Sequence, residues 1–243
     1  MLSRPVRRRR RPSGPARLGL LGGFELDLAG RLAQPPLHVQ KLLAFAALQR
    51  RPLQRAYVAG HLWFELSQEH ANACLRSTLW RMSRFSVPLV QATSTHLSLE
   101  PAVAVDAREL DAAAQRVLRG SGPPAREDAD LLASAAELMP DWYDDWLLPE
   151  RDRLRQIRLL ALEAAGEAFV EERRYSEAAI TALAAVETDP LRDSAYRLLI
   201  RAYLGAGNLA EALRQFGVFR SRLGRELGLA PSPQMLDLVA GIT

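Results

Sequence analysis

The chain has 243 residues, enough for two small domains, and its 48% hydrophobic and 25% charged residues are the balance typical of a soluble globular protein. No apolar run is long enough to cross a bilayer, and no apolar segment follows the N-terminal arginines as a secretory signal would require, so we expect a cytoplasmic protein without a membrane partner. One cysteine, Cys74, excludes an internal disulfide and a cysteine-based zinc cluster.

Charge is distributed unevenly along the chain. Residues 1–100 hold 15 bases and 5 acids, a net of +10, whereas residues 101–243 hold 17 bases and 23 acids, a net of −6. A basic half suits a polyanionic partner, and an acidic half suits contacts with proteins. We therefore expect the two halves to bind different partners.

The N-terminal half predicts a small domain of strands and helices. Residues 1–16 have little to bury, which predicts a disordered, Arg-rich tail. The alternating stretch 17–30, broken at Gly22-Gly23, predicts a short strand pair. Three helices, a hairpin around Thr93-Ser94-Thr95 and a further strand are expected to follow, over residues 38–51, 53–64, 70–85, 88–101 and 103–105.

The second half predicts helices from Asp106 onward, with Asp106 as the N-cap of a helix over residues 106–118 and a loop over 119–128. Glu177-Ala178 and Glu211-Ala212 lie 34 residues apart in two similar stretches, which is the period of tetratricopeptide helix pairs. We therefore expect an antiparallel helical stack with a concave face.

Catalytic and metal-binding patterns are weak. The acids of "PDWYDDWLLPER" (140–151) are better interpreted as caps and solvated residues than as the paired carboxylates of a glycosidase. The same stretch predicts an aromatic core of Trp142, Tyr143 and Trp146. The four histidines fall in different predicted elements, and no phosphate-binding or hydrolase motif is present. We expect no cofactor, no metal and no enzymatic activity.

The helix expected over 70–85 has one side without acids. Leu75, Leu79 and Met82 form an apolar stripe that is expected to pack on the two preceding helices. The other side is a face of bases, an amide, a hydroxyl and one indole: Asn72, Arg76, Ser77, Trp80, Arg81 and Arg84. A DNA-facing surface must lack carboxylates because phosphates repel them, and Arg and Asn can bond phosphates or base edges. Alternatively, the face is solvated, and Trp80 packs against the hairpin or the next domain.

The order of strands, three helices and a hairpin is that of a winged helix-turn-helix, in which the third helix enters the DNA major groove. The fold class we predict is mainly α with small β. An N-terminal winged helix-turn-helix over residues 17–104 precedes an all-α tetratricopeptide-like helical domain over 105–243. Further DNA-binding residues are expected on the wing and its flanks, namely Arg55, Thr93, Ser94 and Thr95.

The chain resembles the SARP regulators (Streptomyces antibiotic regulatory proteins), which join an OmpR-like winged helix to a bacterial transcriptional activator domain. The first-half resemblance includes "ANACLRSTLWRMSR" and "VAVDAREL". The more specific second-half stretches include "PDWYDDWLLPERDRLRQIRLLALEAAGE" and "ELGLAPSPQM". Together the matching stretches cover nearly everything after residue 16. The Arg-rich tail lies outside the family pattern.

The resemblance implies a sequence-specific activator that binds direct repeats in double-stranded promoter DNA as two protomers side by side, a homodimer on DNA. It also implies recruitment of RNA polymerase and its sigma factor, control of secondary-metabolite genes and a location at the nucleoid. Larger relatives carry an ATPase module or a forkhead-associated domain. Neither is recognisable here, so we expect no switch driven by nucleotide or phosphopeptide.

Other functions remain open at the level of sequence. One is a tetratricopeptide-type adaptor whose basic half binds an acidic protein. Another is a repressor that uses the same DNA-binding domain. An enzyme is disfavoured because no catalytic constellation can be assembled.

Overall fold

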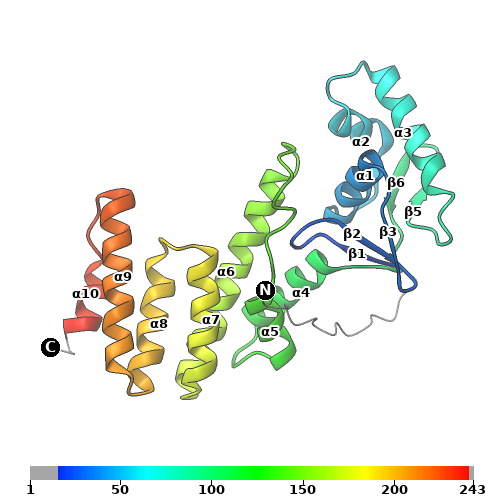
Figure 1. Ribbon diagram of the computed structural model, residues 1–243. Helices are drawn as coiled ribbons and strands as arrows, with labels where there is room; N and C mark the ends of the chain where they lie inside the picture. Colours follow the sequence, from blue (N-terminus) through cyan, green and yellow to red (C-terminus); the bar gives the residue numbers. More distant parts are fainter. Residues whose placement is uncertain (1–15, 241–243) are drawn as a thin grey trace, which may run out of the picture. The chain divides into compact units, whose positions relative to one another are not determined.

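The computed structural model of the protein describes residues 16–240, which divide into two compact units (Figure 1). The first unit runs up to Arg108 and includes Leu138–Leu148, and the second contains Glu109–Glu137 and the chain from Pro149 onward. The segment 138–148 therefore folds with the first unit, although the sequence analysis assigned it to the second domain. Of the tail expected over residues 1–16, all but Ala16 lies outside the described residues, and Ala16 itself is buried in a strand.

A four-stranded sheet belongs to the first unit, with the order β3-β2-β1-β7. Its strands are β1 (Ala16–Gly19), β2 (Glu25–Leu28), β3 (Arg31–Ala33) and β7 (Val103–Val105). β1 and β2 are antiparallel, as the expected strand pair requires, and β7 runs parallel to β1 with Val103 opposite Ala16. β3 was not predicted. The chain enters it through Gly30, whose φ of 89° is one that glycine adopts without strain.

Three helices and a second sheet complete the winged helix-turn-helix. The helices are α1 (Leu37–Leu48), α2 (Arg55–Leu62) and α3 (Gln68–Met82), and the sheet has the order β4-β6-β5. Its strands are β4 (Leu53–Gln54), β5 (Val90–Ala92) and β6 (His96–Leu99). The expected hairpin is confirmed as β5 and β6. Residues 53–54 were wrongly predicted to be helical, because they pair with β6 in the sheet.

Long-range contacts determine where α1 ends. The helix follows Pro35-Pro36 and stops at Leu48, earlier than the expected residue 51. Its last carbonyls are bonded by the guanidinium of Arg108, which donates from Nε to Ala47 at 2.7 Å and from Nη2 to Gln49 at 2.8 Å. A cation at a helix C-terminus satisfies exposed carbonyls and complements the helix dipole. A residue distant in sequence therefore caps α1.

Asp106 has a wider role than the N-cap predicted for it. It is the first residue of α4 (Asp106–Arg119), and its buried carboxylate accepts hydrogen bonds from three backbone N–H groups. Leu20 donates at 2.8 Å, Leu21 at 3.1 Å and Ala107 at 2.7 Å. The carboxylate therefore holds the residues after β1 against the start of α4.

The aromatic core expected in the segment 138–148 is only partly present. Trp146 packs edge-on against Phe45 of α1, with ring centroids 5.1 Å apart, and Trp142 stacks on Phe24 at 6.4 Å. Tyr143 is 78% exposed, so it was wrongly predicted to be a core residue. The two tryptophans pack against rings that lie about a hundred residues earlier in the chain, so the segment contributes to the core of the first unit.

The second unit is a stack of helices. Beside the C-terminal part of α4 it contains α5 (Arg126–Ser134), α6 (Leu148–Glu171), α7 (Tyr175–Thr188), α8 (Asp193–Gly205), α9 (Leu209–Leu227) and α10 (Pro233–Ala240). Figure 1 shows α6, α7, α8 and α9 side by side in chain order, which is the tetratricopeptide-like stack predicted from the 34-residue period. Tyr196 of α8 and Phe219 of α9 are fully buried in its core, with ring centroids 4.7 Å apart.

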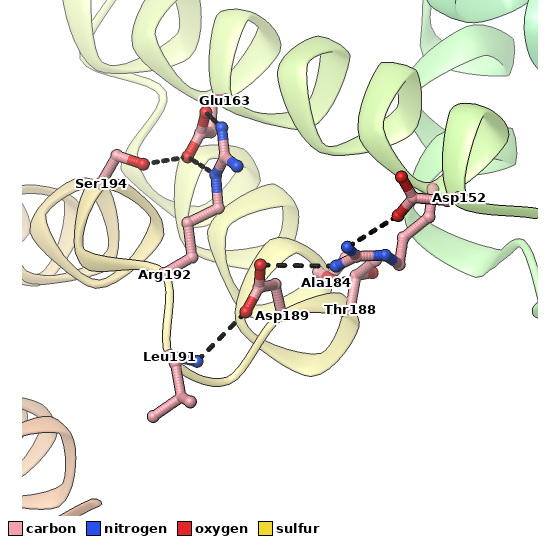
Figure 2. A network of polar contacts seen from close by, with 9 residues as sticks. Asp152, Glu163, Ala184, Thr188, Asp189, Leu191, Arg192 and Ser194 are labelled. Carbon is pink, nitrogen blue, oxygen red and sulfur yellow. Dashed lines mark hydrogen bonds and ion pairs between the residues drawn. The ribbon is translucent and has the colours of Figure 1, made fainter. Parts of the chain in front are cut away.

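Close approach and an ion pair also join α6 to α8. A Cβ added to Gly166 of α6 would lie 2.4 Å from a methyl carbon of Leu198 in α8, so a larger residue there would require the Leu198 side chain to shift. Figure 2 shows the polar side of this contact, where Arg192 forms a two-point pair with Glu163 at 2.7 and 2.8 Å. Ser194 donates to the same carboxylate. Within residues 16–240, no helix has the length and apolar character needed to span a bilayer.

Candidate nucleic-acid interface

α3 begins two residues earlier than the sequence analysis predicted. Ser67 is its N-cap, and the Ser67 hydroxyl accepts a hydrogen bond from the backbone N–H of His70 at 3.4 Å. Gln68 and Glu69 therefore belong to the helix. The sequence analysis expected no acid among the exposed residues of this helix, and Glu69 is such an acid.

Glu69 lies on the exposed side of the first turn, and the i+3 and i+4 spacing of an α-helix puts it on the same face as Asn72 and Arg76. The signal that locates it in the sequence is Ser67, a preferred N-cap residue just ahead of the apolar stripe. An acid in the first turn is favoured by the helix dipole. A glutamate can also accept a hydrogen bond from the amino group of cytosine.

The buried side of α3 is formed by Ala71, Leu75, Thr78 and Met82. Leu75 and Met82 are buried, as the predicted stripe requires. Leu79 was predicted to be part of that stripe but is only half-buried, and Thr78 is buried in its place. The Thr78 hydroxyl donates to the backbone carbonyl of Cys74 at 2.9 Å, which satisfies a polar group at little cost in the packed seam.

The opposite face of α3 is exposed at Arg76, Ser77 and Arg81, while Asn72 is half-buried and accepts a hydrogen bond from Gln68 at 3.3 Å. The helix ends at Met82, earlier than the predicted residue 85, so Arg84 lies in the turn after it and is exposed there. Trp80 is 57% exposed, contrary to the alternative that it packs against the hairpin. The guanidinium of Arg84 lies over the Trp80 ring, 4.0 Å from its centroid. This cation–π contact holds Arg84 against the last turn of the helix.

A groove of about 670 Å³ separates the first half of α3 from the wing, the turn between β5 and β6. Five of the predicted site residues line it: Arg55, Asn72, Arg76, Ser94 and Thr95. Gln54 and His96 also line the groove and were not predicted. The structure thus brings together residues from α2, α3 and the wing. Ser77, Trp80 and Arg81 lie on α3, and Arg84 lies in the turn after it, all outside the groove lining.

Hydrogen bonds fix the shape of the wing. The Thr93 hydroxyl accepts from the backbone N–H of His96 at 3.0 Å, and the Thr93 N–H donates to the His96 carbonyl at 2.8 Å. Nη1 of Arg55 donates to the Thr93 carbonyl at 3.1 Å. Thr93 and Arg55, both predicted to be DNA contacts, are therefore engaged in holding the wing, whereas Ser94 and Thr95 are exposed at its tip.

Electrostatics near the first turn of α1 also favour a neutral histidine. Burial lowers the pKa of His38, and the positive charge of Arg81 lowers it further. His38 therefore adds no positive charge near neutral pH, and the cationic character beside it comes from Arg81.

Comparisons with known proteins extend these observations. The family model of the bacterial transcriptional activator domain matches residues 105–243. Regulatory protein AfsR of Streptomyces coelicolor is 28% identical over 242 residues, covering 93% of this chain and 24% of that protein. Regulatory protein AfsR of Streptomyces griseus is 32% identical over 111 residues, which are 46% of this chain and 11% of that protein. The chain thus spans at most about a quarter of the length of these curated relatives.

A solved structure resembles the fold. Mycobacterium tuberculosis EmbR in complex with a low affinity phosphopeptide matches with a TM-score of 0.69 and 20% identity, over 95% of this chain and 65% of that chain. At this identity the match supports the fold alone.

The match to the bacterial transcriptional activator domain and the relation to the AfsR proteins place the chain in a class of transcription regulators. The chain belongs to the bacterial transcriptional activator domain family, and it is a regulator of the SARP type, as the sequence resemblance predicted.

Proposed function

We propose that the protein binds promoter DNA sequence-specifically through α3 and the wing. The observation that carries this proposal is the exposed face of α3, where Arg76 and Arg81 are exposed to solvent while Leu75 and Met82 pack against the rest of the domain. Arg84, in the turn after α3, adds a third exposed arginine. An α-helix fits the width of the major groove, and arginines can bond both phosphates and guanine edges.

Different parts of the interface are assigned different tasks. The N-terminal part of a recognition helix contacts base edges, so Asn72, Arg76 and Ser77 are proposed to select sequence. Arg84, held over Trp80 near the other end, is proposed to bond phosphate together with Arg81. Ser94 and Thr95 at the wing tip supply hydroxyls for the backbone beside the groove. Arg55 and Thr93 contribute by holding the wing in place.

The helical second unit is proposed to turn DNA binding into activation. Its family match and the relation to AfsR support recruitment of RNA polymerase and its sigma factor. We further propose that two copies bind adjacent direct repeats as a homodimer on DNA, and that the targets include secondary-metabolite genes. These proposals rest on the SARP resemblance.

Selection from random duplexes with the full chain tests the first proposal. We expect a recurring direct repeat, bound more tightly than its scrambled version in fluorescence anisotropy by at least about a thousandfold. Transcription in vitro from a promoter with that repeat should rise when the protein is added to polymerase holoenzyme. Equal affinity for selected and scrambled duplexes would contradict sequence-specific binding. A fall in transcription would make the protein a repressor.

A further inference from the structure

A second cavity lies in the first unit, away from the groove beside α3. Its volume is about 790 Å³, and it is lined by residues of α1, by the end of α2 and the turn after it, and by the segment 138–148. It shares no lining residue with the groove between α3 and the wing. The volume is within the range of about 300–1,000 Å³ that is typical of small-molecule sites.

Aromatic rings form much of the wall of this cavity. Phe64 and Tyr143 are 73% and 78% exposed, an unusual degree of exposure for two large rings lining one cavity. His61 and Trp146 complete the aromatic lining and are held more firmly. The His61 ring lies 4.0 Å from that of Tyr57, and Trp146 packs edge-on against Phe45. The cavity thus has a fixed floor and two exposed rings.

Three charged side chains line the cavity, and two of them form an ion pair. Asp144 pairs with Lys41, Oδ1 to Nζ, at 2.5 Å, so these two charges neutralise one another. Asp145 also lines the cavity, is exposed, and has no ion pair with any of residues 16–240. The net charge at the cavity wall is therefore negative.

From these features we propose that the cavity binds a small organic cation, an amine or quaternary ammonium. The cationic group lies against the Asp145 carboxylate and the rings of Phe64 and Tyr143, since aromatic faces attract cations. This inference does not depend on the proposed DNA binding, because the cavity shares no residue with that surface.

Choline and its uncharged carbon analogue 3,3-dimethylbutan-1-ol form a matched pair of probes, with the same shape and hydroxyl and a difference of one charge. The full ¹⁵N-labelled chain is titrated at constant ionic strength, and the indole N–H resonance of Trp146 is followed, assigned with Trp146→Phe. We expect a saturable shift with choline and about two- to fivefold weaker binding of the alcohol, the size of an exposed cation–π contact.

Asp145→Asn should weaken choline binding by up to about fivefold, since it removes the charge of an exposed acid while keeping the side-chain shape. Asp141→Asn removes an exposed acid of the same segment that does not line the cavity, and it should leave binding unchanged. Equal binding of the two probes, no saturable shift, or unaltered binding by Asp145→Asn would each overturn the proposal. A shift with an arginine-rich peptide but not with choline would overturn it in favour of a protein contact.

Discussion

Arg55 at the start of α2 is bonded to the wing turn at two points. Its guanidinium donates to the Thr93 carbonyl at 3.1 Å, and its backbone N–H donates to the Thr95 carbonyl at 2.8 Å. The second bond also continues the pairing of β4 with β6. The orientation of the wing relative to α3 therefore depends on a residue of α2.

Arg55→Ala should loosen the wing without unfolding the domain. The side-chain bond that it removes is exposed, so the free energy of unfolding should fall by no more than about 1.5 kcal/mol. Amide hydrogen exchange at Ser94 and Thr95 should quicken, and affinity for the selected duplex should fall. Arg51→Ala removes the same charge from an exposed position outside the groove. An equal loss of affinity in both variants would indicate general attraction to phosphate instead of wing positioning.

Arg76→Ala should impair sequence discrimination. Arg76 is exposed on a rigid helix and lines the groove, so it is placed to bond a base edge. We expect a loss of about 1–3 kcal/mol on the selected duplex and much less on a scrambled duplex. Arg84→Ala should weaken binding to both duplexes similarly and flatten the salt dependence, by about 0.9 for each phosphate that is no longer neutralised. Anisotropy at several salt concentrations measures both effects. Equal weakening of the two duplexes by Arg76→Ala would make Arg76 a phosphate contact.

Leu75→Asp and Ser77→Asp place the same acid on opposite sides of α3. Leu75 is 1% exposed, so an unpaired charge there should lower the free energy of unfolding by several kcal/mol, at least about 3. Ser77 is exposed, and its replacement should change stability by less than about 0.5 kcal/mol while abolishing DNA binding through phosphate repulsion. Thermal melting and anisotropy distinguish the two. A stable Leu75→Asp variant would show that the faces of α3 are assigned the wrong way round.

Asp106→Asn should destabilise the first unit by about 2–3 kcal/mol, because a charged acceptor of three backbone bonds is replaced by a group with one acceptor oxygen. The amide nitrogen would then face a backbone donor. Urea unfolding of the full chain, monitored by tryptophan fluorescence, measures the change, since Trp63, Trp80, Trp142 and Trp146 all belong to the first unit. Asp141→Asn, at an exposed position, is the control. Equal urea midpoints for the Asp106→Asn and Asp141→Asn variants would contradict this role of Asp106.

Acid should weaken the second unit partly through Glu163. Burial alone would raise the pKa of this carboxyl, but hydrogen bonds from Arg192 and Ser194 outweigh burial and hold the pKa below its ordinary value of 4.5. A lowered pKa in the folded state contributes stability that is present above pH 4.5 and is lost as the pH falls through the folded-state pKa. The melting temperature should therefore fall below pH 4.5.

Glu163→Gln should make the melting temperature less dependent on pH. It should also lower the free energy of unfolding at neutral pH by about 1–3 kcal/mol, the contribution of hydrogen bonds to a charged group. Calorimetric melting between pH 3 and pH 7 measures both effects. Glu171→Gln, at an exposed position on the same helix, should retain the dependence of the unaltered chain. If the melting temperature of the Glu163→Gln variant fell with pH as steeply as that of the unaltered chain, the Glu163–Arg192 pair would not contribute to the acid sensitivity.

The sequence by itself determined the elements whose signals are local. The alternation in residues 17–30, the hairpin around Thr93-Ser94-Thr95 and the 34-residue period of the helical stack all follow from spacing along the chain, and each is present in the structure. The apolar stripe of α3 separated its buried side from its exposed side in the same way, because a helix repeats every 3.6 residues whatever surrounds it.

Only the tertiary structure decided the features that depend on distant partners. Leu53 and Gln54 form a strand because β6 offers them backbone hydrogen bonds, and α1 ends where Arg108 reaches its carbonyls. Tyr143 is exposed while its neighbours Trp142 and Trp146 find rings to pack against. Arg55, predicted to contact DNA, also bonds the Thr93 carbonyl of the wing, which its type and position in the sequence do not indicate. The energy of a hydrogen bond or a packed ring belongs to a pair of groups, so the identity of one residue cannot specify it until folding supplies the other.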